Sequence, residues 1–533
     1  MNREDHLNTL KRDRFDLLVI GGGATGAGIA LDAASRGLRT ALVERDDFSA
    51  GTSSRSTKLI HGGVRYLERA VKKLDRSQFN LVRDALKERA VLLRIAPHLA
   101  KQLPLVTPLY NWLEVPYYLT GLKLYDALAG KAKLQTSRFV DAQEAMSRFP
   151  MLKAEGLRGG VIYYDGQFDD ARMNVAIALT AAEQGAVIAN HLEVRAISKT
   201  NGKCDGAEVY DYLTGESWLV SAKVVVNATG PFADTIRWLD EPSAPRMLTA
   251  SSGIHIALGP QFSPPETGLL IPQTEDGRVL FLLPWLGHTL VGTTDRPAEI
   301  EANPKAEEAD IEYILRHLHK YFSIPVSRSD VKASWSGLRP LVSDPKASDT
   351  ARLSRDHVIN VSPSGLLTIA GGKWTTYRKM ALDTVNEAVR LGQLSPLRDS
   401  QTETLKLYGG TNYSPTGSGH LQQEYGLAID VASYLNRAYG DRATQVAQLA
   451  RAGYGERLAA GHPYLEAEVI YGATHEFARS SADILARRTR LYWLDQQATL
   501  AAIPLVAELM AKTLGWNEAE RRADIAAATD YLS

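Results

Sequence analysis

Apolar positions near the start of the chain gather into three short blocks. Residues 15–20 are apolar apart from Asp16, as in a strand buried on both faces. Residues 24–34 are small and apolar with one charge, Asp32, and predict a helix packed closely on a sheet. Residues 38–43 predict a second strand. Strand, helix and strand in this order are typical of a doubly wound parallel sheet, so the pattern predicts an α/β fold with a Rossmann-like unit.

The turn between the first strand and the helix fits the pattern G-x-G-x-x-G. Its three fixed glycine positions are Gly21, Gly23 and Gly26. Glycine tightens the turn, lets a pyrophosphate approach the backbone and lets the helix pack on the strand. The helix start at Ala24 and Thr25 would present N–H groups to the pyrophosphate, and Glu44 would accept hydrogen bonds from the ribose hydroxyls. We therefore predict an adenine dinucleotide site; the alternative is a tight glycine turn without a ligand.

Further strands and helices follow with the same alternation. Residues 224–230 form a buried strand ending in Ala-Thr-Gly, a small turn suited to close passage of a dinucleotide. Residues 171–185 predict a helix with Asp169 and Asp170 as candidates for its N-cap. Residues 187–197 predict one more strand.

The pattern changes twice after residue 245. Residues 279–285 and 289–295 are apolar runs separated by Leu-Gly-His, which predicts a hairpin in a separate sheet domain. Residues 391–419 are rich in Gly, Pro and Ser and predict a boundary, and residues 421–533 have helical periodicity throughout. The helical part contains no catalytic constellation, so a structural or dimerisation role is expected, which leaves a homodimer open.

Composition narrows the function classes. A chain of 533 residues exceeds a single core and predicts two or three domains. Equal numbers of basic and acidic residues, 61 each, predict no nucleic-acid partner. The single cysteine, Cys204, excludes an internal disulfide and a cysteine-cluster metal site, and no metal is expected. There is no apolar run of 18 residues, and residues 1–14 are polar, so we expect neither a membrane-spanning helix nor a secretory signal.

A polar segment at residues 47–67 follows Glu44 and ends in two glycines and a basic stretch. Its hydroxyls and N–H groups suit phosphate or polar ring edges, although a capping and turn region would look similar. The strings Thr-Ser-Ser at 52–54 and STKLIHGGVRYLE at 56–68 resemble the FAD-dependent, membrane-associated glycerol-3-phosphate dehydrogenases. Three later blocks, at 334–341, 354–357 and 366–378, match the same family.

The resemblance implies FAD as cofactor and particular residues around it. Beyond the fingerprint, it assigns cofactor contacts to Thr52, Ser53, Ser56, Lys58, Leu59, His61, Val194, Ala228, Thr229, Gly230, Gly372, Lys373, Thr375 and Thr376. It assigns substrate contacts to Arg65, Tyr66, Arg339 and Arg355, and catalytic roles to His61, His255, Arg339 and Lys373. His61 and His255 both remain candidates for the base. Ser252 stands where family members often carry a basic residue, which leaves one substrate contact open.

The segment 103–128 is rich in Trp, Tyr and Leu with few charges, and residues 51–101 hold twelve basic against four acidic residues. Aromatic-rich segments of this kind lie either in a core or at a membrane–water interface. The basic excess has two explanations. The charges lie on a solvated helix face, or they attract a phosphorylated substrate or anionic lipid. With the family resemblance, we expect peripheral contact with lipid, a quinone entry route near residues 110–125, and a cytoplasmic protein at the inner face of the cell membrane.

The expected architecture has three parts. An FAD-binding domain comprises residues 1–95, 150–245 and 335–395, a β-sheet cap comprises 96–149 and 246–334, and an all-α domain comprises 396–533. The implied reaction is oxidation of glycerol 3-phosphate to dihydroxyacetone phosphate by hydride transfer to the flavin, with electrons passed to a membrane quinone. Alternatives are an oxidase that uses O₂ and releases H₂O₂, and a non-enzymatic flavin-binding scaffold.

Overall fold

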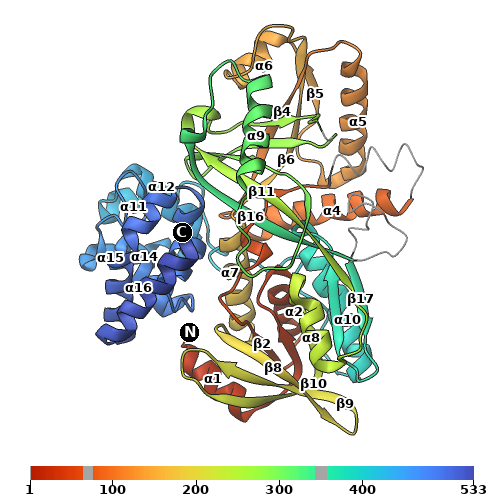
Figure 1. The fold of residues 1–533 in the computed structure, drawn as a ribbon, viewed down its shortest axis with the longest axis vertical. Helices are drawn as coiled ribbons and strands as arrows, with labels where there is room; N and C mark the ends of the chain where they lie inside the picture. The colour runs from red at the N-terminus through yellow and green to blue at the C-terminus, as the bar shows by residue number, and fades with distance from the viewer. Residues whose placement is uncertain (1, 64–75, 276, 343–356) are drawn as a thin grey trace.

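The computed structural model describes residues 2–63, 76–275, 277–342 and 357–533. These residues form two sheets, of eight and ten strands, with a separate group of C-terminal helices. In Figure 1 the first sheet lies in the lower part of the molecule, strands β4, β5 and β6 lie in the upper part, and the C-terminal helices stand to one side. The long strands β11 (Leu248–Leu258) and β16 (Val331–Val342) run between the upper and lower parts.

The first sheet is the predicted doubly wound unit. Its main order is β17-β18-β10-β1-β2-β7, and β8 and β9 extend it beside β10. The strands are β1 (Arg14–Ile20), β2 (Thr40–Val43), β7 (Val187–Ala189), β8 (Leu192–Thr200), β9 (Lys203–Asp211), β10 (Ser217–Asn227), β17 (His357–Val361) and β18 (Leu367–Gly371). Strands β18, β10, β1, β2 and β7 are parallel, so their carboxyl ends meet at one edge.

Helix α2 (Ala24–Ser35) packs between α7 (Asp170–Glu183) and α10 (Tyr377–Gly392) in the same apolar core as the parallel strands. Asp169 caps α7, since its side chain accepts a hydrogen bond from the backbone N–H of Arg172 at 3.1 Å. This confirms the capping role expected for Asp169. The remaining helices of the first two parts are α1 (Arg3–Arg12), α4 (Arg76–Ile95), α5 (Glu114–Ala129), α6 (Ala142–Arg148), α8 (Ala233–Asp240) and α9 (Glu308–Tyr321).

The single strand predicted over residues 187–197 is wrong. The chain forms β7, breaks at 190–191, and resumes as β8. His191 has a φ of 56°, which ends the extended run, and β7 pairs with β2 whereas β8 pairs with β9. The polar pair Asn190 and His191 occupies the break, and the predicted strand ran across it.

The second sheet has the order β15-β11-β14-β13-β12-β4-β6-β3, with β16 beside β11 and β5 beside β6. Its remaining strands are β3 (Leu59–Ile60), β4 (Ala100–Leu109), β5 (Arg138–Val140), β6 (Gly159–Phe168), β12 (Gly268–Ile271), β13 (Leu280–Trp285), β14 (His288–Gly292) and β15 (Arg296–Ala298). Strands β13 and β14 form the predicted hairpin. Strand β6 pairs with β4 along its whole length, so the expected boundary at residue 150 precedes a strand of this second sheet.

The C-terminal part is helical, as predicted. Its helices are α11 (Gly417–Tyr425), α12 (Ile429–Tyr439), α13 (Ala443–Leu449), α14 (Glu466–His475), α15 (Gln496–Leu514) and α16 (Glu518–Leu532). Their apolar faces share one core with residues of the second sheet, including Trp335 and Trp285. No helix within the described ranges has both the length and the hydropathy needed to cross a bilayer.

Candidate functional site

At the glycine turn the backbone segments cross and pack so closely that two positions, Gly21 and Gly26, have no room for a side chain. A Cβ at Gly26 would lie 1.8 Å from the carbonyl oxygen of Gly21. Gly21 itself has a φ of 108°, and a Cβ there would lie 2.8 Å from the carbonyl oxygen of Ala228. The crossing therefore brings the start of α2 against the turn after β10, as a dinucleotide fingerprint requires.

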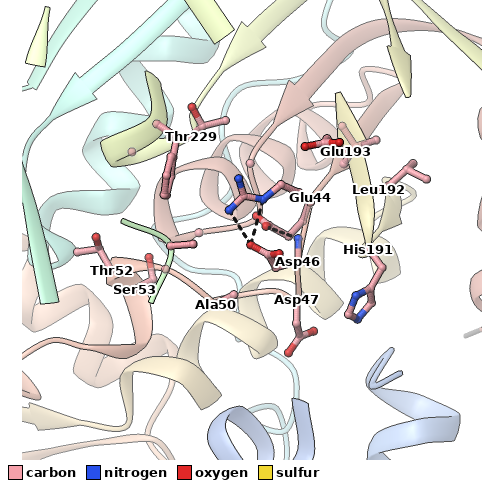
Figure 2. A pocket seen from close by; sticks show the side chains of 18 of the residues that line it. Glu44, Asp46, Asp47, Ala50, Thr52, Ser53, His191, Leu192, Glu193 and Thr229 are labelled. Atoms are coloured by element: carbon pink, nitrogen blue, oxygen red, sulfur yellow. Dashed lines mark hydrogen bonds and ion pairs between the residues drawn. The ribbon is translucent and has the colours of Figure 1, made fainter. Parts of the chain in front are cut away.

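A cavity of about 550 Å³ opens beside this turn (Figure 2). Among its lining residues are the predicted Gly21, Gly23, Ala24, Thr25, Glu44, Thr52, Ser53, Val194, Ala228, Thr229 and Gly230. They come from the carboxyl ends of the parallel strands β1, β2 and β10, from the start of α2, from the turn at Thr52 and Ser53, and from β8. A concave site at this edge of a doubly wound sheet is the usual place for a dinucleotide.

Glu44 lies at the end of β2 with its carboxylate against the glycine turn. It accepts hydrogen bonds from the backbone N–H of Gly22 at 2.5 Å and of Asp46 at 2.9 Å. Burial, together with the charge of Asp46, raises the pKa of Glu44 to about 7. Figure 2 shows Glu44 and Asp46 side by side in the cavity wall.

A second cavity, of about 290 Å³, adjoins the first, because Thr25, Ser53 and Gly230 line both. Ser53 joins three elements: its Oγ accepts from the N–H of Ala24 at 2.9 Å, and its carbonyl accepts from the indole N–H of Trp374 at 2.9 Å. The predicted residues that line this second cavity also include Ser56, Leu59, His61, His255, Arg339, Gly372, Lys373 and Thr375. One elongated ligand would therefore contact both groups of predicted residues.

His255 lies on β11 with its ring in the wall of the second cavity. Its Nε2 is 2.9 Å from the Thr57 hydroxyl, and its ring stacks on Trp335. Burial, together with the cations Lys58 and Arg339, holds the pKa of His255 well below 6.5. The imidazole is therefore neutral at physiological pH and able to accept a proton.

Arg339 crosses from β16 over the backbone of β11. A Cβ at Gly253 would lie 2.2 Å from its Nη2, so the guanidinium occupies the space that glycine leaves free. Its Nη2 donates to the Thr293 hydroxyl and the Thr294 carbonyl, both at 3.1 Å, and its Nη1 lies 3.4 Å from a carboxylate oxygen of Asp295. These contacts hold a cation in the cavity wall, where an anionic substrate group would meet it.

His61 and Lys373 approach the same cavity from two other segments. The Thr375 hydroxyl links the segments, because it accepts from the N–H of His61 at 3.3 Å and donates to the His61 carbonyl at 3.4 Å. Gly371 and Gly372 both have a φ of 77°, which produces the turn that Lys373 follows. The structure thus places both candidate bases and one cation beside Arg339.

Three of the predicted cofactor residues, Gly26, Lys58 and Thr376, line neither cavity. Lys58 is fully buried outside both cavities, and its ammonium donates to the carboxylate of Asp170 at 2.6 Å and to the carbonyl of Ser54 at 2.7 Å. Thr376 lines neither cavity, and its hydroxyl donates to the Lys373 carbonyl at 3.1 Å. The predicted substrate residues Arg65, Tyr66 and Arg355 lie outside the described residues.

The C-terminal part also lines the larger cavity, which sequence reasoning missed. The contributing residues are Ser480, Ala482, Asp483, Arg487, Asp524, Ala527, Ala528 and Tyr531. The signal was present in the string RRTR at 487–490, because three arginines in an otherwise apolar segment require buried acidic partners. The sequence alone did not say which acids those partners are.

Those partners lie in the segment after β2 and at the start of α7. Arg487 and Arg488 pair with Asp47 at 2.6 and 2.8 Å, and Arg490 pairs with Asp170 at 2.8 Å. All five side chains are at most 4% exposed. Breaking one partner of a buried pair leaves an uncompensated charge, so the network fixes how the C-terminal part sits on the sheet.

The chain is similar to known proteins over its whole length. The chain matches the family model of FAD dependent oxidoreductases over residues 16–378 and that of the C-terminal domain of alpha-glycerophosphate oxidase over residues 400–521. It is 50% identical to the mitochondrial glycerol-3-phosphate dehydrogenase of Bos taurus and 49% identical to that of Homo sapiens, covering 100% of this chain and 75% of each relative. A glycerol-3-phosphate dehydrogenase from Bacillus halodurans, solved with FAD, superposes with a TM-score of 0.81 at 30% identity, covering 99% of this chain and 97% of that one.

Proposed function

The chain belongs to the FAD-dependent glycerol-3-phosphate dehydrogenases, and from this premise we propose that it oxidises glycerol 3-phosphate to dihydroxyacetone phosphate with FAD as cofactor. The observation that carries the proposal is the shared wall of the two cavities. A dinucleotide site and a pocket containing a cation and a neutral imidazole adjoin at Thr25, Ser53 and Gly230.

The residues present fit FAD. The crossing at Gly21 and Gly26 leaves no room for a Cβ, and the 550 Å³ cavity with buried Glu44 suits an adenosine and pyrophosphate. The second cavity, entered past Ser53, would hold the ring system against Lys373 and Thr375. When bound, FAD supplies the hydride acceptor for the alcohol carbon of the substrate.

The residues of the second cavity have different roles toward the substrate. The guanidinium of Arg339 binds the phosphate, because a planar fork of donors matches phosphate oxygens. The Nε2 of His255, on a ring that its depressed pKa keeps neutral, takes the hydroxyl proton. His61 lines the same cavity and is the second candidate for the base. Arg65, Tyr66 and Arg355 complete the proposed substrate contacts, and Lys373 places a positive charge beside the flavin.

The visible spectrum of the purified protein tests the proposal. Flavin absorption bands are expected, and anaerobic addition of glycerol 3-phosphate should bleach them. Arg339→Met, a matched variant of similar length without the charge, should keep the bands and require at least tenfold more substrate for bleaching. A colourless protein that takes up no FAD, or bands that glycerol 3-phosphate leaves unchanged, would overturn the proposal.

For the electron acceptor, we propose a membrane quinone reached by peripheral contact with lipid. Trp112, Leu113 and Tyr117, at the start of α5, are 58%, 83% and 47% exposed. Exposed aromatic and apolar side chains gathered at one helix end favour an interface with lipid. The oxidase alternative is tested by acceptor dependence: turnover sustained by O₂ alone, without a quinone analogue, would contradict the quinone.

A further inference from the structure

Asp47 is a fully buried carboxylate in the wall of the larger cavity. Its oxygens accept from Nε of Arg487 at 2.6 Å, from Nη1 and Nη2 of Arg488 at 2.8 and 3.1 Å, and from the Asn190 amide at 3.0 Å. Within the part of the chain that the structure describes, Arg487 and Arg488 are the only cations paired with Asp47. The charge of a cavity-wall residue is thus compensated from a segment 440 positions away in the sequence.

A second contact joins the same two regions across the cavity. His191 Nε2 lies 3.0 Å from the carboxylate of Asp483, and Asp483 pairs in turn with Arg487 at 2.6 Å. Burial lowers and Asp483 raises the pKa of His191, with a net upward shift, which favours a charged pair. In Figure 2 the side chains of Asp47 and His191 extend toward the blue ribbon of the C-terminal helices.

The charges that line this cavity explain why neutralisation of Asp47 by arginine affects ligand binding. Its acidic lining residues are Glu44, Asp46, Asp47, Glu193, Asp483 and Asp524, and its basic ones are Arg45, Arg487 and His191. A pyrophosphate adds further negative charge to this space. Without its arginines, Asp47 would remain a buried, unpaired carboxylate beside that anion, and both desolvation and repulsion would oppose binding.

We infer that the C-terminal helical domain is part of the FAD site: Arg487 and Arg488 neutralise Asp47, so that domain docking and FAD binding strengthen each other. The inference rests on FAD being the cofactor, as proposed above. Coupling of this kind is reciprocal: if docking of the domain increases the affinity for FAD by some factor, bound FAD increases the equilibrium constant for docking by the same factor. The domain therefore retains the cofactor besides supporting the fold.

Arg490 reinforces the coupling through the segment that contains Ser54 and Ser56. It pairs with Asp170 at 2.8 Å, and Asp170 accepts from the backbone N–H of Ser56 at 3.0 Å and from its hydroxyl at 2.7 Å. Arg490 also donates to the Ser54 carbonyl at 3.1 Å. Docking of the C-terminal domain thus orders the segment that joins the two cavities.

The rate of FAD release from the full-length holoenzyme, followed by the rise of flavin fluorescence on dilution, tests the charge argument. Arg487→Gln should release FAD at least tenfold faster than the wild type. Asp47→Asn combined with Arg487→Gln should recover most of that loss, because removing one carboxylate together with one guanidinium restores the charge balance of the cluster, in which Arg488 also pairs with Asp47. Arg522→Gln, which breaks an exposed ion pair with Glu518 in the same domain, is the matched control and should leave release unchanged.

Two results with the variants would overturn the inference: release from Arg487→Gln within twofold of the wild type, or a double variant that releases FAD as fast as the single one. A readout on the wild type guards against misfolded variants. FAD added to the flavin-free chain should slow amide hydrogen exchange in residues 483–488 at least fivefold, and unchanged exchange would also overturn it. Wild-type bleaching by glycerol 3-phosphate separates these failures from failure of the proposed function.

Discussion

The imidazole of His255 lies flat against the indole of Trp335, with ring centroids 5.4 Å apart and planes inclined by 16°. The two residues are direct cross-strand partners on β11 and β16. On the other side, His255 faces Gly292 of β14, where a Cβ would lie 2.1 Å from the ring. The register of three neighbouring strands therefore fixes the ring whose Nε2 faces Thr57.

Replacing His255 with Asn is expected to lower kcat by about 10²–10⁴-fold, the usual contribution of a positioned general base. FAD should be retained, because the ring does not line the larger cavity that would hold the adenosine and pyrophosphate. In the wild type, the acid limb of the kcat/KM profile should lie well below pH 6.5, since the depressed pKa keeps the base neutral down to that range. His61→Asn is the companion variant: if it loses activity and His255→Asn does not, His61 is the base.

Gly253→Ala should impair substrate binding without any change of charge. The new methyl group would displace the guanidinium of Arg339, whose Nη2 lies 2.2 Å from the Cβ position. We expect KM for glycerol 3-phosphate to rise at least tenfold, as in Arg339→Met, with flavin absorbance retained. Gly419→Ala is the control, since open space surrounds that position. An unchanged KM in Gly253→Ala would remove Arg339 from the substrate site.

Gly26→Ala should yield a protein without FAD. A Cβ 1.8 Å from the Gly21 carbonyl forces α2 away from the turn that would cradle the pyrophosphate. Overpacking of this kind costs about 1–3 kcal/mol or more of folding stability. The ratio of flavin to protein absorbance and the unfolding midpoint measure both effects, again against Gly419→Ala. A yellow, fully stable Gly26→Ala protein would show that the crossing tolerates a methyl group.

Folding stability should fall as the pH drops below 6.5, partly through His98. Burial, together with the nearby cations Arg172 and Lys406, lowers the pKa of His98 to about 3. The unfolded chain binds the proton near pH 6.5 and the folded chain does not, so each pH unit in this window costs about 1.4 kcal/mol per such histidine.

Urea unfolding between pH 7 and pH 5 measures this slope. His98→Asn should reduce the slope relative to the wild type. Equal slopes for the wild type and His98→Asn would contradict the assignment.

The combined change Trp112→Ser and Leu113→Ser should weaken co-sedimentation with lipid vesicles. Burial of one such side chain contributes about 1.5–3 kcal/mol, so losing both should abolish most binding. Ile429→Ser, at an exposed apolar residue of the C-terminal domain, is the control. Wild-type protein that never partitions to vesicles would exclude lipid contact through this segment.

Much of the site was readable from the sequence because the responsible residues are contiguous. The turn from Gly21 to Gly26, the strand before it and Glu44 after it form one unit whose hydrogen bonds and close contacts are local, so spacing alone predicted the dinucleotide cavity. The hairpin of β13 and β14 and the helical C-terminal part were predictable for the same reason, since each depends on a periodic pattern within one segment.

Tertiary structure decided what depends on contacts between distant segments. Sheet membership placed β6 beside β4, and it divided residues 187–197 between β7, which pairs with β2, and β8, which pairs with β9. The ammonium of Lys58 pairs with Asp170 instead of lining a cavity, and Arg487 reaches Asp47 across the domain boundary. The sequence determined which local units form and which charges would need partners. Only the fold decided which residues became partners. Two buried charges stabilise each other only when packing brings them within hydrogen-bond distance, and the spacing of residues along the chain does not determine which pairs meet.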